Sequence, residues 1–269
     1  KKAIESFFLK EFALTDAVFH VNNLEKEREF NIQKLNISLK DLLINQPPGK
    51  FSISNKSVDF SIGKFTGRLT KRAIKYIDFE DFKIELDSLN VQQSVDTAMF
   101  HFSDFNMGLK KLDIQTADSV SHFTMESYDL SYKDKSIKLK NVSFKPNISE
   151  AAMQKKYAYQ HTQFSGTVGS MEMLGVNFDS LIYKRKIFID EILLDKVAVS
   201  IFKDKTKPFD TNKFPVYLGQ QIGGIPITLM VKQLKATDVN LVNRELKPTG
   251  DYGKANINRA TLTVKNITT

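Results

Sequence analysis

The chain contains no cysteine and no tryptophan among its 269 residues. Without cysteine there is no disulfide framework, no thiolate metal site and no cysteine nucleophile. No apolar run approaches the roughly 18–20 residues that a membrane-spanning helix needs, and the first five residues lack the apolar region of a signal peptide. We therefore expect either a protein that is soluble as it stands or a segment excised from a longer one.

A repeat dominates residues 1–145. It is a fifteen-residue pattern, Φ-x-Φ-x-x-Φ-x-Φ-x-Φ-x-x-Φ-x-Φ, in which Φ is apolar. Apolar residues fill 38 of the 42 Φ positions and only 5 of the 48 x positions. The six copies, 23 or 24 residues apart, begin at Phe7, Phe30, Ile53, Ile77, Phe100 and Phe123. A fixed period of this size is typical of a stacked β repeat.

The pattern also predicts where each strand bends. Alternation places one set of side chains on one face of a strand, but each x-x step would send the next apolar set to the opposite face. A corner or bulge at each polar doublet keeps every Φ residue on the inside of a curve. Six such U-shaped units would build a trough, with strands either parallel or in an antiparallel meander. Examples of the doublets are Glu80-Asp81, Asp87-Ser88, Ser103-Asp104 and Lys110-Lys111.

Residues 146–269 continue the β pattern with two interruptions. Short helices are predicted near 149–160 and 215–222, and we expect them to plug the trough or close one lip. Strand patterns resume around them, and Ile187 to Ile201 repeats the earlier rhythm of alternation and shift. The predicted fold is all-β: one elongated curved repeat, an open β-solenoid or taco-like groove, with two short helical insertions.

The net charge of +8 is spread along the x positions, where lysine and arginine mix with aspartate and glutamate. This distribution indicates a solvated outer face, with lysines protecting strand edges. A weak attraction to anionic membrane surfaces is the alternative. We do not expect a nucleic-acid partner, because the aromatic residues occupy Φ positions and do not alternate with basic ones as a stacking platform requires.

Residues suited to catalysis are few. The four histidines are not spaced as metal ligands, and Gly223-Gly224 follows no phosphate-loop pattern. An acidic cluster could supply a carboxylate pair for glycoside chemistry, but an outward-facing acidic stripe is the interpretation that we favour. The cluster consists of Asp78, Glu80, Asp81, Glu85 and Asp87. We predict a protein that is not an enzyme and holds no metal or cofactor.

Three stretches resemble the AsmA-like family of Gram-negative envelope proteins. They are Asp81–Leu89, Ser131–Pro146 and the closing run Ile227–Thr268, in which apolar strands, asparagines and a loop with glycine recur in order. The resemblance implies a periplasmic protein anchored to the inner membrane. It also implies a β-groove that holds phospholipid acyl chains and helps move them toward the outer membrane. Family members usually begin with a membrane helix, so the resemblance favours an excised central segment.

The Φ residues themselves allow two interpretations. In the first, they form a filled core, as in a closed β-solenoid that serves as a scaffold or adhesive surface without lipid. Alternatively, the abundance of Phe and Met and the lack of convergent polar residues suit a disordered hydrocarbon guest. For the second interpretation we predict a lipid-binding floor made by the middle Φ residue of each U. These residues are Ile37, Phe60, Ile84, Met107 and Leu130.

Overall fold

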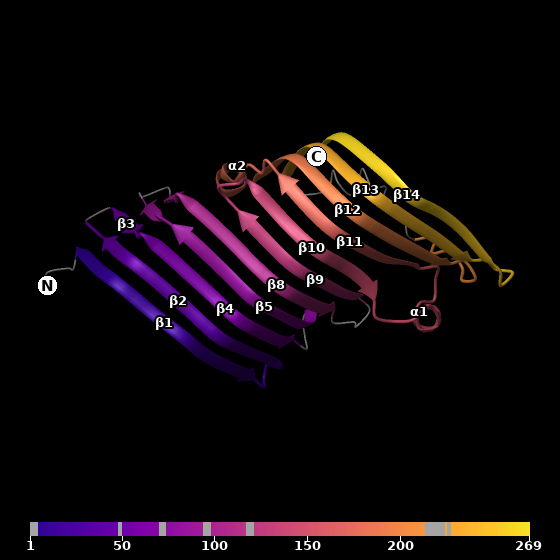
Figure 1. Ribbon diagram of the computed structural model, residues 1–269. Coiled ribbons are helices and arrows are strands. Elements are labelled where there is room, and N and C mark those ends of the chain that lie inside the picture. Colours follow the sequence, from indigo (N-terminus) through magenta and orange to yellow (C-terminus); the bar gives the residue numbers. More distant parts are fainter. Residues whose placement is uncertain are drawn as a thin grey trace.

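The computed structural model describes residues 5–47, 50–69, 74–93, 98–116, 121–212, 224 and 227–269. They form one open, curved sheet of fourteen strands with two short helices (Figure 1). The first nine strands are β1 (Ser6–Asn23), β2 (Arg28–Asn45), β3 (Phe51–Ser54), β4 (Ser57–Leu69), β5 (Ile74–Asp87), β6 (Asn90–Gln93), β7 (Ala98–His101), β8 (Asp104–Thr116) and β9 (Ser121–Ser131). The remaining elements are β10 (Ser136–Pro146), α1 (Glu150–Lys156), β11 (Thr162–Leu174), α2 (Phe178–Lys184), β12 (Lys186–Asp204), β13 (Thr228–Leu246) and β14 (Tyr252–Thr268).

The strands form an antiparallel meander, which answers the question of direction that the repeat pattern leaves open. Strands that are neighbours in the sheet pair antiparallel, and among the described strands only β12 and β13 pair parallel. Each of the first five copies of the repeat is one long crossing of the sheet. Three of these crossings are interrupted at a corner, which divides them into β3 and β4, β6 and β5, and β7 and β8.

The predicted corners are present at the polar doublets. Asp41, Asp81, Ser88 and Lys111 each take a left-handed backbone conformation, with φ between 48° and 53°. Positive φ is uncommon for residues other than glycine, and here it marks β-bulges that turn the strand without moving its apolar side chains to the other face. At Ser103, where no positive φ is found, the chain bends between β7 and β8.

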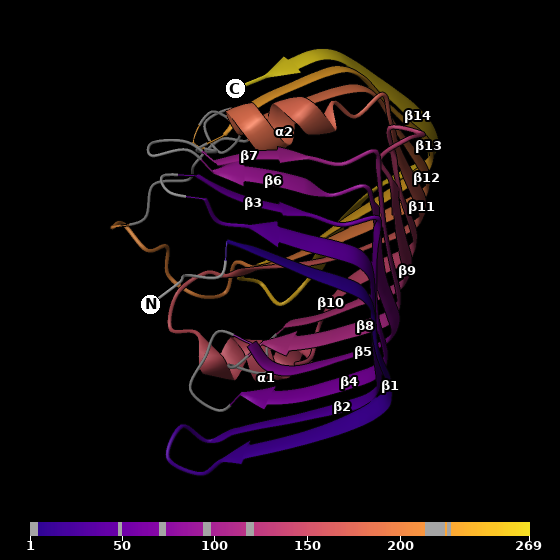
Figure 2. The ribbon, with the colours of Figure 1, turned by 90° about the vertical axis from the view of Figure 1, so that its left-hand side faces the viewer.

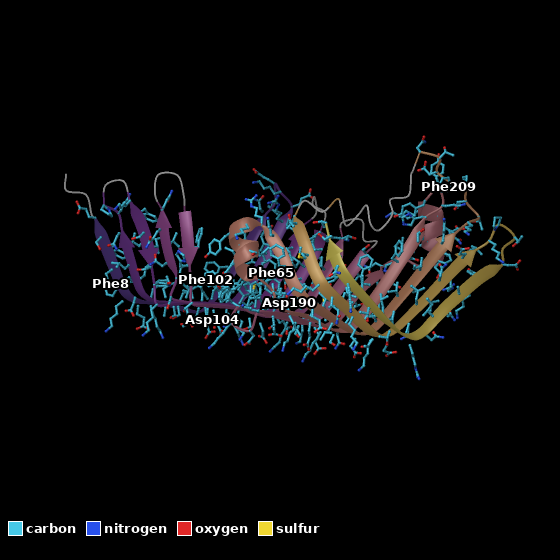
Figure 3. The ribbon with its side chains drawn as sticks, turned by 90° about the horizontal axis from the view of Figure 1, so that it is seen from above. Phe8, Phe65, Phe102, Asp104, Asp190 and Phe209 are labelled. Carbon is cyan, nitrogen blue, oxygen red and sulfur yellow. The ribbon has the colours of Figure 1, made fainter. Side chains whose placement is uncertain are left out.

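These corners give the sheet a U-shaped cross-section (Figure 2). β3, β6 and β7 form one arm of the U in the N-terminal half, and the long strands form the base and the other arm. The side chains of Phe65 and Phe102 lie inside the trough, whereas Asp104 lies on its outer face (Figure 3). The interior is therefore apolar and the convex face is polar, as the repeat pattern predicts.

An asparagine two residues after a bulge stabilises the corner at both edges of the sheet. Asn36 Oδ1 accepts the backbone N–H of Asp16 at 2.9 Å, and Asn36 Nδ2 donates to the carbonyl oxygen of Lys34 at 3.1 Å. In the last hairpin, Asn240 accepts from the N–H of Arg259 at 3.1 Å and donates to Asp238 in the same manner. Backbone groups freed by the bulge thus find side-chain partners.

We expect Asn36→Ala to lower the free energy of unfolding by about 1–2 kcal/mol, because it removes two hydrogen bonds between the Asn36 amide and the backbone at the corner. Chemical denaturation of the two proteins measures the difference. Asn31→Ala, on the outer face of the same strand, is the matched control and should change stability by less than about 0.5 kcal/mol. Equal effects of the two substitutions would mean that the amide does not support the corner.

The sixth repeat departs from the prediction. Its second polar doublet, Lys133-Asp134, does not bend a long strand but lies in a tight turn between β9 and β10. The N–H of Lys135 donates to the carbonyl oxygen of Tyr132 at 3.1 Å, and Ser131 Oγ donates to the Asp134 carboxylate at 3.0 Å. Side-chain capping of this kind favours a turn. The crossing therefore ends early and loses its second arm.

Of the two helices described, α1 was predicted from the sequence and α2 was not. α1 lies within the predicted 149–160 segment, capped by Ser149, and the predicted helix 215–222 lies outside the described residues. α2 lies in a part of residues 146–269 for which the sequence predicted no helix. Asn177 caps it by accepting the N–H of Ser180 at 2.9 Å, and a cap of this type starts a helix despite the apolar alternation.

α2 covers the best-buried part of the molecule. Phe178, at 5% exposure, packs with Val176, Ile189 and Val231 in the main apolar cluster, and its ring lies 5.8 Å from that of Tyr132. The whole chain exposes 17713 Å² of surface. A compact monomer of its 30.7 kDa mass would expose about 12,000 Å². The fold is thus an extended, open trough with a limited core of its own.

Candidate functional site

The five residues predicted to form a floor lie in one continuous row. Each is the direct cross-strand partner of the next, although they come from five different repeats. The pairs are Ile37 with Phe60, Phe60 with Ile84, Ile84 with Met107, and Met107 with Leu130. The sheet therefore brings together all five side chains on its concave face.

The row extends beyond the predicted residues to both edges of the sheet. Leu14 precedes it, and on the other side follow Ile137, Met173, Ile192, Leu234 and Val264. Eleven strands thus contribute one apolar residue each. At about 4.8 Å between strands, this row, here called the floor row, is roughly 48 Å long.

Further apolar rows run beside the floor row. One comprises Phe12, Leu39, Val58, Leu86 and Phe105, and another comprises Leu109, Tyr128, Leu139, Met171, Leu194, Ala236 and Leu262. Aromatic rings also pack across strands on this face: Phe65 stacks on Phe79 at 4.8 Å, and Phe60 meets Phe82 edge-on at 6.0 Å. The concave face is therefore a broad apolar surface rather than a single stripe.

None of the eleven side chains in the floor row is buried. Ten are half-buried, and Val264, on an edge strand, is 38% exposed. Residues of this size in a filled core would lose nearly all contact with water. The two arms of the U therefore do not close on each other, and the sheet is an open groove rather than a closed solenoid.

Polar groups on the concave side are few in the described part of the chain. Asn55 occupies a Φ position at the corner between β3 and β4 and is 6% exposed. Its Oδ1 has no hydrogen-bond partner, and the same is true of Oδ1 of the nearby Asn90. These two amides lie at the corner, away from the floor row, so the floor itself offers a guest no hydrogen-bonding group from a side chain.

The acidic cluster lies on the convex face and is occupied by ion pairs. Glu80 is 2.6 Å from Lys111 and 3.5 Å from Lys64, and Asp81 is 3.1 Å from Lys110. The hydrogen bond from Lys111 holds the pKa of Glu80 below its usual value. Cross-strand ion pairs of this kind are typical of a solvated strand face. The cluster therefore provides no pair of carboxylates in a cleft for glycoside chemistry.

The described residues present neither a cluster of metal ligands nor a membrane-spanning helix. No group of three histidine, aspartate or glutamate side chains there is placed to hold a metal ion; His122 is near a single carboxylate, 2.9 Å from Asp113. None of the helices described is long and apolar enough to cross a membrane. The groove is the most extensive feature that these residues present.

Comparisons with known proteins add no assignment, since no family model, curated protein or solved structure matches this chain. The function has to be argued from the groove itself.

Proposed function

We propose that this chain is a non-enzymatic lipid-shielding groove that binds phospholipid acyl chains along the floor row. The observation that carries the proposal is the half-exposure of eleven aligned apolar side chains, one from each long strand, on the concave face of an open sheet. Contiguous exposed apolar surface of this extent is rare on soluble proteins and marks a binding site.

Acyl chains suit this surface better than a small ligand does. Ligand pockets usually combine apolar walls with a few polar groups that orient the ligand, and the side chains of the floor row have none. Each acyl CH₂ that moves from water to the groove is stabilised by about 0.8 kcal/mol. Neighbouring strands offer nearly equal walls, so a bound chain can slide along the row without a large barrier.

The length of the groove supports more than one lipid. The hydrocarbon core of a bilayer is about 30 Å thick, so the acyl chains of one leaflet span about 15 Å. The floor row is about three times as long. A groove of this length is suited to transport along its axis, and phospholipid transport across the periplasm, as the AsmA-like resemblance implies, is the form of the proposal that we favour.

The proposal is tested by extracting the purified protein with organic solvent and identifying lipids by mass spectrometry. We expect one or more phospholipids per chain. A scaffold or adhesive protein that carries no lipid, which is the competing interpretation, would yield only traces after the same purification.

A further inference from the structure

The two edges of the sheet are long strands with exposed apolar side chains. Among the described strands, β1, with 18 residues, pairs only with β2, and β14, with 17 residues, pairs only with β13 (Figure 1). Six large apolar side chains are exposed on β1 and four on β14, which makes ten of the twenty in the described part of the chain. The unpaired backbone groups of an edge strand are a template for a further strand. Exposed apolar surface is thus concentrated where such a strand would pair.

The two edges have the polarity to pair with each other. Followed across the sheet, strand direction reverses at every pairing except that of β12 with β13, so β14 runs opposite to β1. A second copy whose concave face continues that of the first therefore places its β1 antiparallel to β14. This is the arrangement of every other neighbouring pair of the sheet but one.

The corners of the two edge strands also match. β1 has a positive φ of 50° at Asp16, and β14 has one of 51° at Arg259. In both strands an asparagine of the neighbouring strand accepts the N–H of that residue. Placing the two corners side by side sets a register in which apolar residues of the concave faces are opposite each other. The opposed pairs are Phe12 with Leu262, Leu14 with Ala260, and Ala17 with Ile257.

The charges of the two edges are complementary. β1 carries one basic and two acidic side chains, a net charge of −1, whereas β14 carries three basic and no acidic ones, a net charge of +3. In the register set by the corners, Asp16 meets Arg259, and Glu11 lies diagonally across from Lys265. Opposite charges at such positions stabilise a strand pair.

The sheet already contains a corner of this kind. Where β5 and β8 bend side by side, Glu80 lies 2.6 Å from Lys111 and Asp81 lies 3.1 Å from Lys110. A symmetric contact of two β1 strands at the same corner would instead oppose two aspartates, and one of two β14 strands would oppose two arginines. Like charges directly opposite each other destabilise a strand pair. The charges therefore favour β14 with β1.

We propose that copies of this chain associate head to tail, with β14 of one copy paired antiparallel with β1 of the next in the register set by Arg259 and Asp16. The contact joins two different surfaces, so it repeats from copy to copy and builds an open filament unless rotation closes a ring. The floor row of each copy then continues into that of the next. The proposal concerns the sheet edges and does not depend on whether the groove binds lipid.

Sedimentation velocity of the purified chain gives the first test. We expect species heavier than the 30.7 kDa single chain, whose mass rises with concentration beyond that of a dimer. A wild-type chain that stays at the mass of one copy at every concentration would overturn the proposal. A chain that stops at a dimer would point to a symmetric contact and would overturn it as well.

Charge reversal of one edge at a time tests which strands pair. Glu11→Lys/Asp16→Lys and Arg259→Glu/Lys265→Glu should each raise the dissociation constant for self-association by about tenfold or more, because the facing charges become alike. An equimolar mixture of the two variants should associate again, since the reversed β1 of one variant meets the reversed β14 of the other. Pairing of β1 with β1, or of β14 with β14, does not predict both results.

The matched control is Asp59→Lys/Asp129→Lys. It changes the net charge as Glu11→Lys/Asp16→Lys does, but at exposed positions of the inner strands β4 and β9. It should associate like the wild type. Circular dichroism establishes that each variant is folded. Wild-type association of either edge variant alone, or a mixture of folded variants that remains dissociated, would contradict the proposal.

Single cysteines test the register, because the chain has none of its own. Ala17→Cys in one copy and Ile257→Cys in another should form a disulfide under mild oxidation, since directly opposed residues have Cβ atoms about 4.5–5.5 Å apart, close to the separation in a disulfide. Ala13→Cys, four residues away on the other face of β1, is the control and should not crosslink to Ile257→Cys. Crosslinking of Ala17→Cys only with itself, or equal crosslinking of both β1 positions to Ile257→Cys, would reject the proposed pairing.

Discussion

Replacing Ile84 or Met107 by aspartate is expected to prevent phospholipid from co-purifying with this protein. Both residues lie at the middle of the floor row, paired directly with each other. A carboxylate pressed against hydrocarbon either remains charged at a cost of several kcal/mol or takes up a proton. Since 1.4 kcal/mol corresponds to a factor of ten in affinity, retention should fall by more than about tenfold in each variant.

The matched control for these variants is Lys83→Asp. Lys83 precedes Ile84 in β5 but points to the convex face, where its ammonium group lies 3.7 Å from Glu85 at an exposed position. The control introduces the same carboxylate one residue away and should leave the lipid content unchanged. Circular dichroism establishes that each variant is folded. A folded Ile84→Asp protein with the lipid content of the wild type would reject the groove as the binding site.

Phe178→Ala is expected to produce the largest loss of stability, about 3–5 kcal/mol. The ring is 5% exposed and fills the centre of the main apolar cluster, between Val176, Ile189 and Val231. Its removal leaves a cavity in the cluster. Most other apolar side chains of the molecule are half-exposed, so few other buried contacts stabilise the fold. Denaturation with urea, followed by circular dichroism, measures the change.

The control for this substitution is Leu181→Ala in the same helix. Leu181 is 37% exposed, so its truncation should cost less than about 1 kcal/mol. If both substitutions have similar small effects, the cluster beneath α2 is not the main stabilising core of the molecule.

The floor of the groove could be predicted from the sequence because the repeat is strict in residues 1–145. With a constant period and constant corners, the middle Φ of each copy falls at the same depth, and Ile37 to Leu130 are in fact direct partners. The corners followed from the same argument, since only a bend at Asp81 or Lys111 keeps both flanking apolar sets on one face.

The rest of the floor could not be predicted in the same way. Met173, Ile192, Leu234 and Val264 belong to strands beyond the six copies of the repeat, so no template assigns them a register. Ile137 is the last Φ residue of the sixth copy, and it joins the floor row because the turn at residues 132–135 folds the chain back. The direction of the strands could not be predicted either, because apolar and polar residues alternate in the same way in parallel and antiparallel sheets. The turn at residues 132–135 and the helix α2 result from local capping by Asp134 and Asn177, which overrides an apolar pattern that otherwise continues.

The central claim, that acyl chains contact the floor row, is tested most directly by site-specific photocrosslinking. A benzophenone-bearing amino acid replaces Ile37, Ile84 or Met107, or the outward-facing neighbours Lys83 or Glu85, and the protein is loaded with radiolabelled phospholipid before irradiation. The account predicts labelled protein for the three floor positions and none above background for the two outer positions. Equal labelling of both faces, or no labelling at the floor of a lipid-loaded protein, would contradict it.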